Sequence, residues 1–80
     1  MVVKVPQDGG IRYFDFKCLI GAQIIDETVA FFLDDDSIVS VTFKDKEIAE
    51  DVVDDLYYSD RKLFEIDEDD VVEVVYGESY

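Results

Sequence analysis

The sequence contains no histidine, a single cysteine and no long apolar run. Without histidine the chain cannot form a Ser-His or Cys-His nucleophile pair, nor a metal site with imidazole ligands. The lone Cys18 cannot form an internal disulfide, which fits a reducing cytoplasm. No stretch reaches the ~18–20 apolar residues that span a bilayer, and residues 1–6 lack the apolar core of a signal peptide. We therefore expect a protein of the cytoplasm (host cytoplasm if viral) without a membrane anchor.

Basic residues are also scarce, because seven Lys and Arg stand against 21 Asp and Glu, for a formal charge of −14. Such a surface repels nucleic acid and anionic membranes and attracts basic protein surfaces. Hydrophobic residues nevertheless make up 49% of the 80 residues, so the chain should fold rather than stay disordered. The length suits one domain, residues 1–80, with a small core. We expect a basic protein partner, and neither nucleic acid nor a membrane.

The negative charge is concentrated in the second part of the chain. Residues 1–33 hold four acids and three bases, a net charge of −1, whereas residues 34–80 hold seventeen acids and four bases, a net of −13. No repeat, linker or low-complexity segment divides the two parts. The sequence therefore predicts one domain with a nearly neutral half and an acidic half.

Alternating apolar residues, many of them β-branched or aromatic, predict strands. We expect strands over residues 2–5, 11–19, 24–33, 38–43, 63–66 and 71–76. Pro6 should end the first of them, and a turn should follow at residues 8–10. Gly21 should break or bulge the chain, and Ile25 should share a face with Val29 and Leu33. The expected fold class is α+β, an antiparallel sheet of about five strands with one helix across a face.

Residues 45–58 change to a helical period. Apolar residues there recur at spacings of three and four, which is typical of an amphipathic helix. Asp45 is a plausible N-cap, and Glu47 lies in the positive first turn. By contrast, Asp54 and Asp55 lie near the negative end of the helix dipole, where each is unfavourable by a few tenths of a kcal/mol. Helix stability therefore does not explain them.

Enzyme chemistry has little support in these residues. No Gly-rich phosphate loop is present, and a chain of this size offers little volume for the cleft of a two-carboxylate glycosidase. The acidic runs suggest calcium, but Ile38 and Val71 occupy the fifth positions of the two candidate loops, where an EF-hand needs a ligand. We expect neither an enzyme, nor a cofactor, nor a dedicated metal site.

The helix is the most informative segment for function. Like charges four residues apart, such as Glu47 and Asp51, have no basic compensation except Lys46 at the helix start. A solvated surface is the alternative interpretation, but this repulsion favours a selected anionic stripe, extended by the acidic loops on either side. Tyr58 and Tyr80 are expected to add contacts, because tyrosine is enriched at interface hot spots. The expected partner-binding residues are Asp34, Asp35, Asp36, Glu47, Glu50, Asp51, Asp54, Asp55, Tyr58, Asp67, Glu68, Asp69 and Asp70.

In composition and charge layout the chain resembles small, acidic, phage-encoded DNA mimics, a set that includes anti-CRISPR proteins, anti-restriction proteins and inhibitors of uracil-DNA glycosylase. The resemblance implies a stoichiometric inhibitor that occupies the basic nucleic-acid channel of a host defence or DNA-processing complex. No individual residue is assigned a role by it.

Two other interpretations remain open. The chain could be a small acidic adaptor that docks through a sheet edge or an apolar patch, with residues 71–76 as the edge or as the seam of a homodimer. It could also be adapted to high salt, although its three alanines and its uneven charge argue against that. Salt dependence separates these hypotheses, because electrostatic capture weakens as ionic strength rises.

Overall fold

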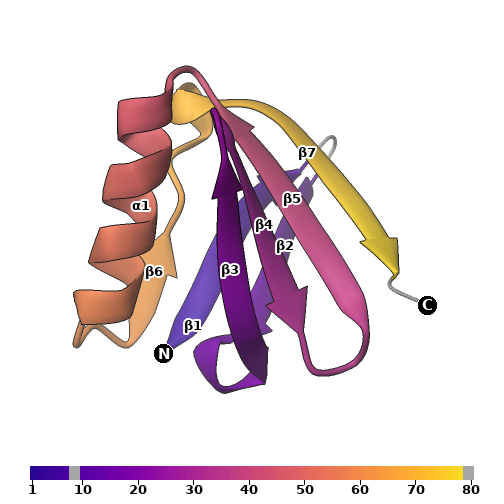
Figure 1. Ribbon diagram of the computed structural model, residues 1–80. Coiled ribbons are helices and arrows are strands. Elements are labelled where there is room, and N and C mark those ends of the chain that lie inside the picture. The colour runs from indigo at the N-terminus through magenta and orange to yellow at the C-terminus, as the bar shows by residue number, and fades with distance from the viewer. Residues whose placement is uncertain (8–9, 79–80) are drawn as a thin grey trace.

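The computed structural model describes residues 1–7 and 10–78 of the chain. The elements in order are β1 (Val2–Gln7), β2 (Gly10–Asp15), the 3-10 helix η1 (Phe16–Cys18), β3 (Leu19–Ile25), β4 (Thr28–Leu33), β5 (Ser37–Phe43), α1 (Lys46–Tyr58), β6 (Leu63–Glu65), the 3-10 helix η2 (Glu68–Asp70) and β7 (Val71–Glu78). The α+β class is confirmed, but the single sheet of about five strands is wrong. The described residues form two sheets, with the strand orders β2-β1-β6 and β3-β4-β5-β7 (Figure 1).

The smaller sheet explains why Pro6 does not end the first strand. β1 pairs with β2 antiparallel and with β6 parallel, but β6 lies beside residues 2–4 only. The Val2 N–H donates a hydrogen bond to the carbonyl of Lys62 on the β6 side. Because the strand alternates, the backbone nitrogen of residue 6 points to the same side as that of residue 2. Since β6 has already ended there, the N–H that proline lacks would have had no strand to bind. β1 therefore continues to Gln7.

The strand expected over residues 11–19 ends at Asp15, where η1 begins, and the last residue of that range, Leu19, is the first residue of β3. Asp15 caps this short helix by accepting a hydrogen bond from the Lys17 N–H at 2.9 Å. The chain thereby leaves the smaller sheet and enters the larger one at β3. Gly21 produces a bulge within β3 rather than a break. Of the turn expected at residues 8–10, Asp8 and Gly9 lie outside the described residues.

The strand expected over residues 24–33 is also two strands. Asp26 and Glu27 form a tight turn between β3 and β4, with Asp26 at φ 53°. Aspartate tolerates this left-handed conformation better than most residues, so the turn needs no glycine. The reversal places Ile25 on the exposed side of the sheet, whereas Val29 and Leu33 are buried. The expectation that these three side chains share a face is therefore wrong.

The core lies between the two sheets and under α1. Its largest fully buried side chains include Phe31 on β4, Phe43 on β5 and Leu56 on α1, and Phe14 of the smaller sheet meets Phe31 with 6.0 Å between ring centroids. The helix contacts β3, β4 and β5 and covers one side of the space between the sheets (Figure 1). Its bounds agree with the predicted helix, and Asp45 is its N-cap as expected.

Candidate functional site

The solvent side of α1 carries the carboxylates that the sequence singles out. Ala49 and Leu56 are buried and define the inner side of the helix. At 100° per residue, the acids fall on the opposite side, within an arc of roughly 140°. All of them are exposed: Glu47, Glu50, Asp51, Asp54 and Asp55. The structure therefore brings these five predicted residues together on one helix face.

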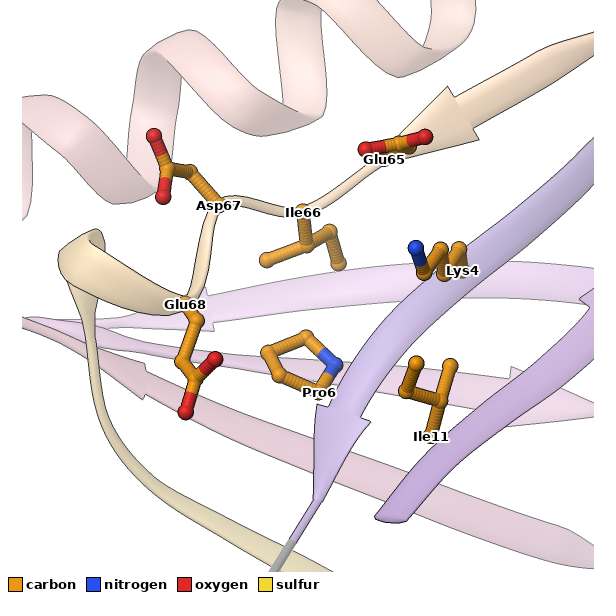
Figure 2. A pocket seen from close by; sticks show the side chains of 7 residues that line it. All are labelled: Lys4, Pro6, Ile11, Glu65, Ile66, Asp67 and Glu68. Carbon is orange, nitrogen blue, oxygen red and sulfur yellow. The ribbon is translucent and has the colours of Figure 1, made fainter.

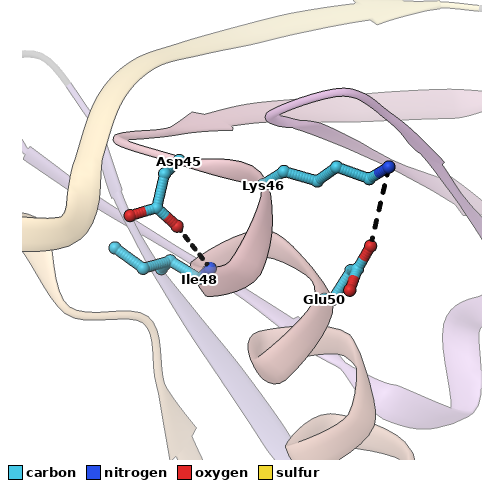
Figure 3. Close-up of polar contacts among 4 residues, drawn as sticks. All are labelled: Asp45, Lys46, Ile48 and Glu50. Atoms are coloured by element: carbon cyan, nitrogen blue, oxygen red, sulfur yellow. Dashed lines mark hydrogen bonds and ion pairs between the residues drawn. The ribbon is translucent and has the colours of Figure 1, made fainter.

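Almost nothing neutralises this helix face. Lys46 and Glu50 form an ion pair at 4.0 Å, and it is the single ion pair within 4.0 Å in residues 1–7 and 10–78 (Figure 3). Both side chains are more than half exposed, so the pair contributes little to stability. At the helix start, Asp45 instead accepts a hydrogen bond from the Ile48 N–H at 2.9 Å. The other four carboxylates face solvent and repel one another.

The acidic segment around η2 lies at the N-terminal end of α1. The Lys44 N–H, just before the helix, donates to the backbone carbonyl of Asp70 at 3.0 Å. Asp67 caps η2 by accepting from the Asp69 N–H at 2.9 Å. Three of the four predicted acids are exposed and Asp70 is half-buried. We call the combined set the acidic surface: Glu47, Glu50, Asp51, Asp54, Asp55, Asp67, Glu68 and Asp69.

The third predicted acidic segment, Asp34–Asp36, lies elsewhere. It forms the turn between β4 and β5, whereas η2 lies beside the other end of β5. Seven strand residues separate these ends by about 20 Å. The hydroxyl and the backbone N–H of Ser37 hydrogen-bond to Asp35 and lower the pKa of its carboxyl below the usual value. Asp35 therefore has a local structural role, and one continuous stripe through all three segments does not form.

The tyrosines divide between contact and packing positions. Tyr58 is 88% exposed at the end of α1, as expected of a contact residue, while Tyr80 lies outside the described residues. Tyr57 packs its ring edge against Phe16, with 5.6 Å between centroids. The Tyr76 ring lies 3.6 Å from the guanidinium of Arg12 on the other sheet, and its hydroxyl hydrogen-bonds to the Ser37 hydroxyl at 2.9 Å. Tyr58 is therefore the described tyrosine best placed to meet a partner.

A hollow of about 430 Å³ adjoins the acidic surface. It forms where β6 ends beside Lys4 and the chain continues to η2, so that Pro6 pairs with Ile11 of β2 but has no strand on the β6 side. Apolar side chains and carboxylates from three segments meet there (Figure 2). The lining residues are Lys4, Pro6, Ile11, Glu65, Ile66, Asp67 and Glu68. Asp67 and Glu68 belong to both the hollow and the acidic surface, which makes the two regions continuous.

The outer face of the larger sheet was not predicted from the sequence as a candidate site. Register places the outward side chains of its four strands in rows, such as Gln23, Ala30, Ser40 and Val75. Several apolar members are well exposed, with Ile20 at 71%, Val72 at 67% and Ile25 at 60%. Consecutive apolar residues inside the strands, such as Phe31 and Phe32, would have indicated this face, because they place apolar side chains on both faces of the sheet.

The described part of the chain offers little support for a metal site, a reactive cysteine or a membrane-spanning helix. No three side chains of His, Cys, Asp or Glu there are grouped so as to hold a metal ion. Cys18 is half-buried, and its partial burial together with Asp34 raises the pKa of the thiol. A thiol with a raised pKa has less of the nucleophilic thiolate. No helix within the described residues is both long enough and apolar enough to cross a bilayer.

Comparison with protein-family models, with curated proteins and with solved structures gives no match to this chain. The assignment of a function therefore depends on the geometry and charge of the surfaces described above.

Proposed function

We propose that the protein is a stoichiometric inhibitor that occupies a basic, nucleic-acid-binding channel of a host defence or DNA-processing complex in the cytoplasm. This is the mode of action of the anti-CRISPR-like DNA mimics that the chain resembles. One observation carries the proposal: five exposed carboxylates share one side of α1, and among the described residues only Glu50 has a basic side chain within 4.0 Å. The acids around η2 lengthen this negative region at the N-terminal end of the helix.

The spacing of the helix carboxylates supports mimicry of a phosphate backbone. Acids three or four residues apart are about 5–6 Å apart on a helix, and duplex DNA carries one phosphate per ~3.4 Å of axis in each strand. A basic channel that holds nucleic acid would meet a comparable charge density along α1, whose thirteen residues span about 20 Å. The carboxylates would then neutralise the basic residues of the channel, as the phosphates of nucleic acid do, and the binding would weaken as salt rises.

The hollow beside η2 would allow the protein to select among basic partners. Pro6 and Ile11 present apolar surface to it, and Glu68 presents a carboxylate (Figure 2). A lysine or arginine of the partner could lay its aliphatic stem on the apolar wall and its charged group on the carboxylates.

Capture from a bacterial lysate tests the proposal. Tagged protein is incubated at about 50 mM salt, washed, and eluted at about 200 mM salt, a range in which electrostatic binding falls steeply. The captured proteins are identified by mass spectrometry, and each is then titrated with its own labelled DNA or RNA. We expect a nucleic-acid-binding protein from which the chain displaces the labelled strand at about one equivalent.

Two variants with equal charge show whether the acidic surface is responsible. The test variant E50Q/D51N/D54N/D55N removes four charges from α1, and the matched control D26N/E27Q/D34N/D36N removes four from the turns of the larger sheet. Asparagine tolerates the positive φ of Asp26 and Asp36, so the control should fold. We expect the test variant to bind about tenfold or more weakly, with a shallower salt dependence. Equal weakening in both variants, or no displacement of nucleic acid, would contradict the proposal.

A further inference from the structure

The outer face of the larger sheet is nearly free of charge in a chain of net charge −14. Strand pairing and alternation assign to this outer sheet face Ile20, Gly21, Gln23, Ile25, Thr28, Ala30, Phe32, Ile38, Ser40, Thr42, Val72, Glu73, Val75 and Gly77. Glu73 is the single charged residue among them. Figure 1 shows this face uncovered in the described residues, with α1 to one side and the smaller sheet behind.

We propose that the outer sheet face is an interaction surface for a second copy of this chain, which forms a face-to-face homodimer. A two-fold interface requires a patch that is complementary to itself, and a sheet face with apolar side chains and a single charged residue meets that condition. A basic partner would gain little here, since the face offers it one carboxylate. Stacked sheets pack about 10 Å apart, a distance at which Ile20, Ile25 and Val75 of each copy would be buried by the other.

The size of the face predicts a weak dimer. Four strands spaced about 4.8 Å apart, each about 20 Å long, present roughly 400 Å². Stable interfaces bury about 800 Å² on each partner, so this face belongs with the small, transient interfaces.

Charge at the ends of the face sets the salt dependence of this dimer. The two turns of the sheet carry Asp26 and Glu27 at one end and Asp34–Asp36 at the other. In the aligned arrangement of two stacked sheets, these acids of one copy approach acids of the second. Salt screens that repulsion, with a Debye length of about 8 Å at 0.15 M and about 3 Å at 1 M. The homodimer therefore strengthens as salt rises, whereas the capture of a basic partner by the acidic surface weakens.

Sedimentation velocity over a range of protein concentrations, at about 0.05 M and about 1 M sodium chloride, tests the inference. We expect a monomer–dimer equilibrium that shifts toward the dimer at the higher salt. The face variant I25T/V75T keeps β-branched residues at exposed strand positions, so it should fold, and we expect it to dimerise about tenfold or more weakly. A second face variant, I20T/V72T, should behave in the same way.

The matched control is I11T/Y13T, which removes two exposed apolar side chains from the outer side of the smaller sheet. Circular dichroism and thermal unfolding establish that each variant is folded before its association is measured. A control that dimerises like the original chain, beside face variants that do not, supports the proposal. A chain that stays monomeric at about 1 M salt, or a dimer that survives both face variants, would overturn it. Neither result bears on the inhibitor proposal, which depends on a different surface.

Discussion

The acidic surface and the outer sheet face differ in the way they treat charge. On α1, five carboxylates share one side with one lysine, whereas on the sheet one carboxylate is accompanied by exposed isoleucine and valine. If negative charge served solubility alone, it would be most useful over the exposed apolar side chains of the sheet. It is concentrated instead on the helix and in the turns. The difference indicates that the two surfaces meet different environments.

The two surfaces are alike in one respect, because the fold depends on the inner sides of their elements. Inward side chains of β4 and β5 hold the core together, while their outward neighbours contact solvent. Likewise, the inner side of α1 is fixed by Ala49 and Leu56, and its acids add repulsion instead of stability. Both surfaces are therefore open to substitution without loss of the fold, and this makes the comparison testable by mutation.

The largest expected effect comes from the adjacent pair Phe31 and Phe32, which point to opposite faces of β4. Phe31 is fully buried and contacts Phe14, so Phe31→Ala should lower the free energy of unfolding by about 3–5 kcal/mol. Phe32 is only half-buried, on the outer sheet face, so Phe32→Ala should cost less than half as much. Urea denaturation of the two variants measures the difference. Equal losses would mean that the outer sheet face is part of the folding core.

The helix and the buried faces of the strands could be predicted from the sequence, because their signals are local. The spacing of Ala49, Val52 and Leu56 sets the period of α1, and Asp45 marks its start. The alternation of Val39, Val41 and Phe43 gives the inward face of β5. Four of the six phenylalanines are buried, and Phe16 and Phe32 are half-buried.

The division into two sheets could not be predicted in the same way. It depends on the 3-10 helix at Phe16–Cys18, which carries the chain from β2 of the smaller sheet to β3 of the larger one and contains neither glycine nor proline. The turn at Asp26 and Glu27, which separates β3 from β4 within the larger sheet, contains neither residue either. The acidic surface could likewise be predicted only in part, because it depends on how distant segments are placed. Sequence spacing placed the acids of α1 on one side, but only the fold shows that Asp67–Asp69 lie beside that helix while Asp34–Asp36 lie about 20 Å away.

A smaller effect is expected on the edge strand β7, where the side chains of neighbouring residues again point to opposite faces of the sheet. The inward Tyr76 hydroxyl hydrogen-bonds to Ser37, which is 4% exposed, so Tyr76→Phe leaves a buried hydroxyl with one partner fewer and should cost about 1 kcal/mol. Val75→Thr, on the outer sheet face, should change stability by less than about 0.5 kcal/mol. In the double variant Y76F/S37A both partners are removed, and the cost should be smaller than for Y76F alone. A double variant less stable than Y76F would assign the additional loss to the hydrogen bond between the Ser37 hydroxyl and Asp35, which S37A also removes.

The smallest expected effect has the opposite sign and concerns the acidic surface. Asp54 and Asp55 lie in the last turn of α1, where no basic residue offsets the negative end of the helix dipole. Asp54→Asn and Asp55→Asn should each raise the free energy of unfolding by a few tenths of a kcal/mol, more at low salt than at high salt. Thermal unfolding at two salt concentrations measures this gain, and Asp34→Asn, in the turn between β4 and β5, provides a control away from any helix end. A stabilised variant that binds the basic partner more weakly would show that these carboxylates are retained for binding, since the fold alone would be better without them. A loss of stability on neutralisation would instead mean that they support the fold, and the contrast with the outer sheet face would disappear.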